Sequence, residues 1–329
     1  MKRRDFLYAG ALGMGSVGWM ACSGNAVEST TQKTIPLKED KAAPFFKLSL
    51  AQWSLNRAFR EQGKDPMDFA KMAAGWGFEG IEYVNHLYAS IYKEAKGNMG
   101  AVLKKMGDDL NIRAKDAGVQ SLLIMVDGEG DLATSDPKKR AEAINNHHKW
   151  IDMAQQLGCH SIRVNLLGDG GKEEMMEHSS SSLTKLCEYA KTGNVNVLVE
   201  NHGGYSSDPQ WLTMVMKNVG MKNVGTLPDF GNFCIKREGG ERWGAPCVEE
   251  YPDYYEAVKM MMPYAKAVSA KSYAFNEKGE ETKIDYHKMM KVVKEAGYKG
   301  FVGVEFEGEA AEEEGILATK NLLLKTSKS

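Results

Sequence analysis

Hydrophobic positions recur along most of the chain in one pattern: an amphipathic stretch with helical spacing, a glycine, a short link and an apolar run. In the first clear example, Asp65 can cap a helix whose first turn contains Pro66. Gly77 can end that helix in the left-handed conformation, and residues 81–84 follow as an apolar run. The pattern predicts a helix followed by a buried strand.

The last unit repeats the same pattern, with Asp285 as the cap, Gly297 as the stop and residues 301–306 as the strand. Further glycines stand before apolar runs in the same way: Gly118, Gly158, Gly193 and Gly220. Together with two more apolar runs, the sequence predicts eight strands. They start near residues 47, 80, 120, 161, 195, 224, 267 and 301.

Helices and strands that alternate at this spacing indicate right-handed parallel βαβ units. Eight such units close into a barrel of about 250 residues. An open doubly wound sheet would carry a glycine-rich phosphate loop after an early strand, and the chain has neither GxGxxG nor GxxxxGKS. We therefore predict an α/β fold in which residues 45–329 form a single (β/α)8 TIM barrel domain.

The first 25 residues have the basic start and the short apolar stretch of an export signal. Arg3 and Arg4, followed by Phe6 and Leu7, resemble a twin-arginine signal. Cys22 after a small residue resembles a lipoprotein cleavage site, with ordinary cleavage nearby as the alternative. Residues 26–44 are expected to form a flexible tether. These features predict an exported bacterial protein, either periplasmic or anchored to the membrane through a lipid on Cys22.

Composition narrows the class of protein further. The 329 residues are 43% hydrophobic and 26% charged, which is typical of a globular protein. The net charge of −2 lacks the basic excess of nucleic-acid binders, so we expect no nucleic-acid partner. Five cysteines are too few for a disulfide scaffold. Cys234 and Cys247 lie in one loop, and they could form a disulfide in an oxidising compartment or remain thiols.

Candidate chemistry follows from the barrel rule that active residues lie at the C-terminal ends of the strands. Glu200, Asp229 and Glu305 lie in or directly after the fifth, sixth and eighth predicted strands. Buried carboxylates are costly unless they are paired or bind a metal. Oxygen ligands favour Mn²⁺ or Mg²⁺, with Zn²⁺ possible if an imidazole joins. Alternatively, Lys271 and Arg163 neutralise these acids.

The same rule marks further polar residues at strand ends as candidates for substrate binding. They are Glu82, His86, Arg163, Asn165, His202, Asn232 and Lys271. Asp127 and Glu129 are expected to be ordinary loop acids. Residues 231–252 form the longest loop after any strand and could fold over the barrel mouth as a lid, or form a surface excursion.

Four segments, LVENHGG, LPDFGNF, VSAKSY and VGVEFEG, resemble in this order the xylose-isomerase-like barrel superfamily, above all its sugar and sugar-phosphate isomerases and epimerases. The resemblance covers residues 47–325. It implies a metal bound by Glu200, Asp229 and Glu305 and by a histidine after the seventh strand. Ser269 stands where that histidine is expected. The metal would then be held by the three carboxylates with another group such as His202, or would be weak or absent.

The acids and the resemblance together imply a metal-assisted isomerase or epimerase that moves a proton next to a carbonyl of a sugar or keto-sugar. Glu200 and Glu305 would exchange the proton, and export argues against a phosphorylated substrate. A keto-sugar lyase or dehydratase at the same site is one alternative. A non-catalytic carbohydrate-binding lipoprotein with a degenerate metal site is another, favoured by Ser269. A nuclease of the superfamily is not expected, because only His86 and His202 lie at predicted strand ends.

Overall fold

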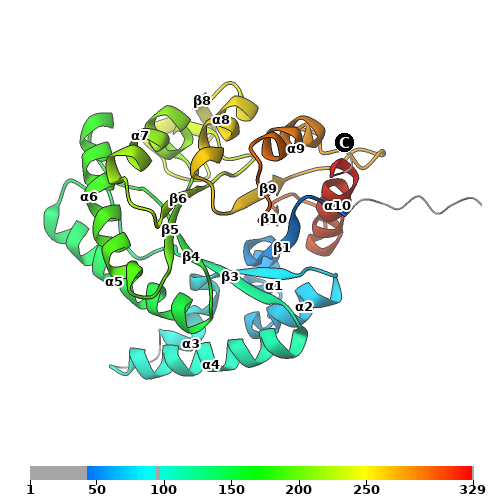
Figure 1. The fold of residues 1–329 in the computed structure, drawn as a ribbon, viewed down its shortest axis with the longest axis horizontal. Helices are drawn as coiled ribbons and strands as arrows, with labels where there is room; N and C mark the ends of the chain where they lie inside the picture. Colours follow the sequence, from blue (N-terminus) through cyan, green and yellow to red (C-terminus); the bar gives the residue numbers. More distant parts are fainter. Residues whose placement is uncertain (1–42, 94–96, 328–329) are drawn as a thin grey trace, which may run out of the picture. The chain divides into compact units, whose positions relative to one another are not determined.

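The computed structural model describes residues 43–93 and 97–327, and in them eight parallel strands form one curled sheet (Figure 1). They are β1 (Lys47–Ala51), β2 (Gly80–Val84), β3 (Gln120–Met125), β4 (Ser161–Val164), β5 (Asn196–Glu200), β6 (Val224–Leu227), β9 (Val268–Ser272) and β10 (Phe301–Phe306). Their order in the sheet is β6-β5-β4-β3-β2-β1-β10-β9. The predicted barrel is confirmed, and every predicted strand start lies within one residue of the observed one.

Where β6 and β9 meet, the barrel closes through two isolated parallel bridges instead of a continuous ladder. Thr226 pairs with Ala265, and Asp229 pairs with Ser269. The second bridge joins two positions that the sequence analysis had placed in or beside the metal site. The closure of the barrel therefore sets the spacing of those two side chains.

Helices surround the sheet on its outer face (Figure 1). They are α1 (Asn56–Arg60), α2 (Phe69–Gly75), α3 (Ala89–Tyr92), α4 (Met99–Ala117), α5 (Pro137–Gln156), α6 (Lys172–Lys191), α7 (Pro209–Val219), α8 (Tyr254–Met261), α9 (Tyr286–Glu295) and α10 (Glu312–Thr326). Asp285 caps α9 as predicted, accepting a hydrogen bond from the backbone N–H of Lys288. The predicted stop at Gly193 is wrong in detail, because Asn194, with φ of 55°, is the left-handed residue there.

Side chains from alternate strand positions divide between two environments. The larger hydrophobic cluster packs the strands against the helices, and a smaller one fills part of the barrel interior with residues such as Leu123, Met125 and Leu198. Glu200 and Glu305 also lie on interior positions, because alternation along a strand repeats every second residue. The barrel interior is therefore apolar in part and strongly charged in part.

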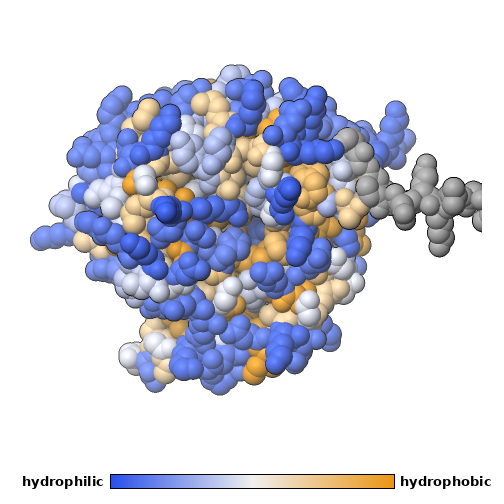
Figure 2. All heavy atoms as spheres, viewed as in Figure 1, coloured by the Kyte–Doolittle hydropathy of each residue, from blue (hydrophilic) through white to orange (hydrophobic). Residues whose placement is uncertain are grey.

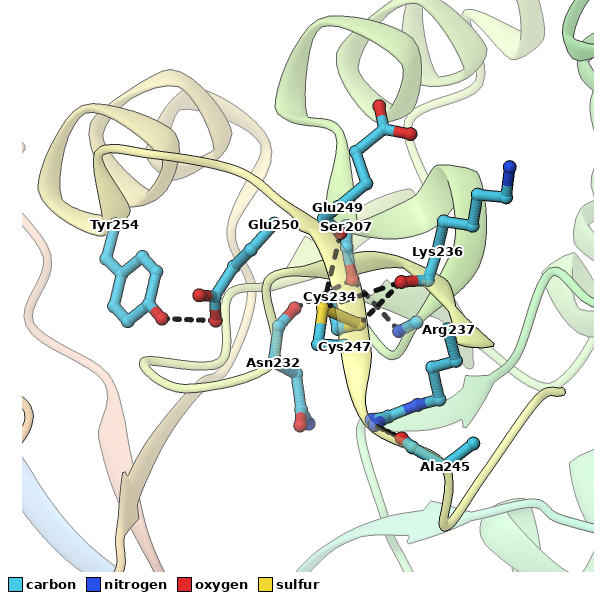
Figure 3. The surroundings of a disulfide bond; sticks show 11 residues. Ser207, Asn232, Cys234, Lys236, Arg237, Ala245, Cys247, Glu249, Glu250 and Tyr254 are labelled. Carbon is cyan, nitrogen blue, oxygen red and sulfur yellow. Dashed lines mark hydrogen bonds between the residues drawn. A yellow bond between two sulfur atoms is a disulfide. The ribbon is translucent and has the colours of Figure 1, made fainter. Parts of the chain in front are cut away.

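The long loop after β6 is folded into a β-hairpin. Its strands are β7 (Cys234–Arg237) and β8 (Cys247–Glu250), which pair antiparallel. A disulfide joins Cys234 and Cys247, and this outcome resolves the question that the sequence left open (Figure 3). Cys159 and Cys187 are buried free thiols.

Most of the outer surface in the view of Figure 2 is hydrophilic. Within the residues that the structure describes, no helix is both long and apolar enough to span a membrane. The predicted export signal, Cys22 and nearly all of the predicted tether lie outside the described residues. Their roles stay predictions.

Candidate active site

Three carboxylates meet inside the C-terminal end of the barrel. Glu200 ends β5, Asp229 follows β6 by two residues, and Glu305 lies in β10. Their side chains each offer an oxygen, and these oxygens lie within 4.8 Å of one another. None of the three residues is more than 3% exposed. The acids that the sequence grouped by strand position are thus brought together.

Glu200 is held by a cation on one oxygen and by an amide on the other. Arg163 Nε lies 2.8 Å from Glu200 Oε2, at an angle that makes an ion pair but no hydrogen bond. Asn232 Nδ2 donates to Glu200 Oε1 over 3.1 Å. Arg163 and Asn232 were expected to bind substrate, and here they orient a candidate catalytic carboxylate.

Ser269 and Lys271 connect the other two acids. Ser269 Oγ lies 2.7 Å from Asp229 Oδ2 and 2.7 Å from Glu305 Oε2. Lys271 Nζ lies 2.9 Å from Glu305 Oε1 and 3.7 Å from Asp229 Oδ2. Both side chains point into the barrel, as alternation along β9 predicts. The neutralisation by Lys271 and Arg163 that the sequence left open as an alternative is therefore part of the site.

Two cations do not balance the acids present. Asp127 also contacts Arg163 at 2.7 Å, and Glu307 contacts Lys271 at 3.3 Å. Burial, the largest cause, raises the pKa of Glu200 to about 7 and that of Asp229 to about 8, against the opposing charges of Arg163 and Lys271. The cluster therefore favours extra positive charge, either as protons or as a bound cation.

Glu305 differs from these two acids. Burial again acts to raise its pKa, but the charge and hydrogen bond of Lys271 and the hydrogen bond from Ser269 outweigh burial and leave the pKa below its usual value. Two neighbouring carboxyl groups with pKa values moved in opposite directions are the arrangement that separates an acid from a base.

A hydrogen-bonded chain joins Arg163 to His202 at the mouth of the barrel. Asp127 Oδ1 accepts from Arg163 and from Asn165 Nδ2, at 2.7 and 2.6 Å. His202 Nδ1 lies 2.8 Å from Asn165 Oδ1. Because that oxygen only accepts, Nδ1 carries the hydrogen and Nε2 is left with its lone pair. Burial lowers the pKa of His202 to about 4, which keeps the ring neutral.

The expectation that Asp127 is an ordinary loop acid is wrong, because its carboxylate binds Arg163 and Asn165 in the site. Its position two residues after β3 was a usable signal, because it obeys the same strand-end rule as the other acids. Glu129, in contrast, binds Lys149 and Trp150 on α5, away from this chain.

The remaining two candidates lie on the β2 side of the site. Glu82 is 1% exposed, and its Oε1 accepts a hydrogen bond from Ser49. Gly303 provides the space for this carboxyl group, since a Cβ at that position would lie 2.4 Å from Glu82 Oε1. His86 Nδ1 lies 3.7 Å from Asp127 Oδ2, and burial lowers its pKa. Substrate binding by Glu82 and His86 stays a prediction.

Two cavities lie beside the β7–β8 hairpin, and neither is lined by Glu200, Asp229 or Glu305 themselves. The inner cavity, of about 210 Å³, is lined by Gly231 and Asn232, whose backbone N–H groups both donate to Asp229. The outer cavity, of about 630 Å³, is lined by His202 and by residues of α6 and η4 (Gly204–Ser207). Arg237 and Trp243 line both cavities. The inner cavity is connected to the carboxylates through Asn232, which lines it and also donates to Glu200.

The residues present fit a divalent cation. Hard oxygen donors from Glu200, Asp229 and Glu305 converge, and they carry more negative charge than their partners neutralise. Glu200 Oε2 accepts no hydrogen bond although it is buried. Ser269 contributes only a hydroxyl, and the lone pair of His202 Nε2 is the imidazole donor nearest to the acids in the hydrogen-bonded chain described above.

Solved structures with the same fold include two sugar epimerases and one zinc-binding protein. The 3-keto-D-glucoside 4-epimerase YcjR from E. coli has a TM-score of 0.61 at 13% identity, over 84% of this chain and 98% of that one. An L-ribulose 3-epimerase has a TM-score of 0.62 at 14% identity, over 86% and 95% of the two chains. The IOLI protein with a bound zinc atom has a TM-score of 0.60 at 15% identity, over 86% and 98%.

No curated protein is significantly similar to the chain in sequence. The model of one protein family, however, matches residues 70–325, which cover all the strand-end acids and the hairpin. The match confirms the superfamily that the four sequence motifs indicated. The chain belongs to the xylose isomerase-like TIM barrels.

Proposed function

We propose that the protein is a metal-assisted isomerase or epimerase that transfers a proton next to the carbonyl of a non-phosphorylated sugar or keto-sugar. The observation that carries this proposal is the convergence of the buried carboxylates of Glu200, Asp229 and Glu305, which offer oxygens within 4.8 Å of one another. The printed names of the neighbours, an L-ribulose 3-epimerase and a 3-keto-D-glucoside 4-epimerase, support the same reaction class.

In this mechanism the two glutamates have separate tasks. Glu305, kept ionised by Lys271, removes the proton beside the carbonyl. Glu200 is the second carboxylate beside the reacting carbon and returns a proton to it. Asn232 and Arg163 fix the orientation of Glu200. A bound Mn²⁺ or Mg²⁺, or Zn²⁺, held by Glu200, Asp229 and Glu305, would polarise the carbonyl and stabilise the developing negative charge.

Proton exchange from D₂O tests the proposal without knowledge of the product. Keto- and aldo-sugars are incubated with the protein and Mn²⁺, and deuterium uptake is followed by mass spectrometry. Glu305→Gln should slow exchange by about 10²-fold or more, because it removes the base. Glu295→Gln, on the exposed surface of α9, is the matched control and should leave exchange unchanged.

Each outcome of this experiment bears on the reaction class. Deuterium in a recovered or rearranged sugar supports isomerisation or epimerisation. Loss of water or of a substituent after exchange would replace the proposal by the lyase or dehydratase alternative. Absence of exchange from every sugar would contradict a proton-transfer enzyme.

One observation favours a second candidate, a non-catalytic carbohydrate-binding protein. Arg163 and Lys271 already form ion pairs with Glu200 and Glu305, and Ser269 already bridges two acids. If these contacts replace the metal, then neither a chelator nor millimolar Mg²⁺, Mn²⁺ or Zn²⁺ will change the melting temperature. A metal-binding site predicts a lower melting temperature with chelator and a higher one with Mn²⁺, by mass action.

A further inference from the structure

The β7–β8 hairpin is tied to the barrel at several points. The disulfide between Cys234 and Cys247 crosses its two strands diagonally, from the start of β7 to the start of β8. At its tip, Arg242 makes two hydrogen bonds to Asp131, of 2.9 and 2.6 Å, after β3. Trp243 packs on His202 with ring centroids 4.7 Å apart. The last two contacts attach the tip of the hairpin to the loop after β3 and to His202 at the mouth of the barrel.

Neighbouring residues of β7 point to opposite sides of the hairpin. Lys236 lies opposite Glu249 in the ladder, and both line the outer cavity. Arg237 lies opposite Cys247 and points to the other side, toward which the Asn232 side chain also extends (Figure 3). Asn232 in turn donates to Glu200. Arg237 is therefore the cation of β7 that lies on the same side of the hairpin as the amide contacting Glu200.

Arg237 has no carboxylate partner within the described part of the chain. Its one hydrogen-bond partner there is the backbone oxygen of Ala245, 2.8 Å from Nη1. The guanidinium is only partly exposed, and it lines both the inner and the outer cavity. A guanidinium carries five donors, so most of them remain available to a ligand.

The charges around the inner cavity also favour an anion. Its charged lining residues are Arg237, Lys283 and Glu250. Glu250 already accepts a hydrogen bond from the Tyr254 hydroxyl. Lys283 lies over the Tyr273 ring, with Nζ 4.5 Å from its centroid. Two cations thus face one acid that is already hydrogen-bonded.

We propose that Arg237 binds a carboxylate on the substrate, so that the substrate is an acidic sugar of the uronate type. The planar guanidinium matches a carboxylate with two parallel hydrogen bonds, a geometry that also gives specificity. This inference rests on the proposed function, because it places the sugar between Arg237 and the three acids. A sulfate ester on a sugar is another anion that a guanidinium could bind.

Binding measurements separate these possibilities without turnover. Isothermal titration calorimetry compares D-glucuronate, D-glucose and D-glucose 6-sulfate on the full protein. The proposal predicts that glucuronate binds at least tenfold more tightly than glucose. Arg237→Gln should reduce this preference to less than twofold, and Arg237→Lys should keep part of it. Lys115→Gln, on the exposed surface of α4, is the matched control and should keep it all.

Equal binding of glucuronate and glucose, or an unchanged preference in Arg237→Gln, would overturn the proposal. Tighter binding of the 6-sulfate than of glucuronate would overturn the assignment to a carboxylate. If Arg237→Gln does not fold, Arg237→Lys still decides the question. The titration measures binding and not proton exchange. If the protein proves not to be an isomerase, the binding result can still be interpreted, and a failure of the carboxylate proposal leaves the exchange experiment unaffected.

Discussion

Ser269 determines the proton count of the candidate site. Its hydroxyl lies 2.7 Å from one oxygen of Asp229 and from one of Glu305, and it has a single hydrogen to donate. One of the two carboxyl groups must therefore carry a proton when no cation is bound. Asp229, whose pKa is about 8, is the one that fits. The serine thus allows a closely packed acid pair in the position where the family resemblance implies a histidine.

The first prediction concerns metal retention. Asp229→Asn removes an anionic oxygen donor while keeping the shape of the side chain, so the variant should lose most of its bound Mn²⁺ after equilibrium dialysis. Metal content is read by elemental analysis. Asp116→Asn, on the exposed face of α4, should retain the wild-type content. Equal metal content in both variants would show that Asp229 is not a ligand.

The second prediction concerns pH and Glu82. Burial raises the pKa of Glu82 from its usual 4.5 to about 8, so the folded state keeps a proton that the unfolded state releases. The free energy of unfolding should therefore fall as pH rises from about 5 to 8, and this contribution is present in full only below the unfolded pKa. Glu82→Gln stays neutral throughout, and its amide can occupy the space that Gly303 leaves.

Urea unfolding at pH 5, 6, 7 and 8, with chelator present in every sample, measures the effect. The stability of Glu82→Gln relative to wild type should increase steadily with pH. Glu295→Gln, whose carboxylate is exposed, should show no such trend. A constant difference between Glu82→Gln and wild type would mean that Glu82 does not titrate in this range.

At the scale of elements, the two strands of the β7–β8 hairpin are joined covalently by a disulfide. The third prediction is that denatured, unreduced protein exposes only two thiols in residues 43–327, those of Cys159 and Cys187. Four reactive thiols would contradict the pairing.

Cys247→Ser should be destabilised by about 3 kcal/mol, the value for closing a short loop, when unfolding is followed in urea. A Cys159→Ser variant controls for the loss of one sulfur.

The strands and most helix ends could be predicted because they follow local rules. Aspartate caps, glycine stops and apolar runs each act within a few residues, and the observed φ of 75° at Gly297 agrees. The hairpin could not be predicted, because its pairing depends on contacts with the barrel and on the disulfide. Asp127 lies in a loop, as predicted, but its ion pair with Arg163 could not be predicted because the two residues are 36 positions apart in sequence.

The sequence predicted which acidic residues form the candidate site, but not which ion pairs and hydrogen bonds join them. Strand-end position placed Glu200, Asp229 and Glu305 together, since parallel strands end at one rim. Which cation pairs with which acid depends on side-chain reach across the barrel, and sequence spacing does not encode that reach. The sequence therefore allows Arg163 either to bind substrate or to neutralise the acids. The ion pair with Glu200 shows that it neutralises them.

For the whole molecule, the fourth prediction is export. Changing Arg3 and Arg4 to lysine should retain the protein in the cytoplasm, because the twin-arginine pathway reads both guanidinium groups. Cys22→Ser should release a soluble periplasmic form if Cys22 is lipidated. Cell fractionation and immunoblotting follow both variants. Arg60→Lys serves as the control, and a membrane-bound Cys22→Ser protein would contradict the lipid anchor.

The seam between β6 and β9 has a consequence for motion. Every other neighbouring pair of barrel strands is joined by a ladder of at least three residue pairs, whereas this seam relies on two isolated bridges. One of the bridges joins Asp229 to Ser269, so local opening of the barrel would separate two walls of the reaction centre. Regions with few backbone hydrogen bonds open at lower free energy than the rest of a fold. We therefore expect local opening of the barrel at this seam to change access to the buried acids. A cation or substrate bound to Asp229 and Glu305 would link the two sides of the seam and oppose this opening.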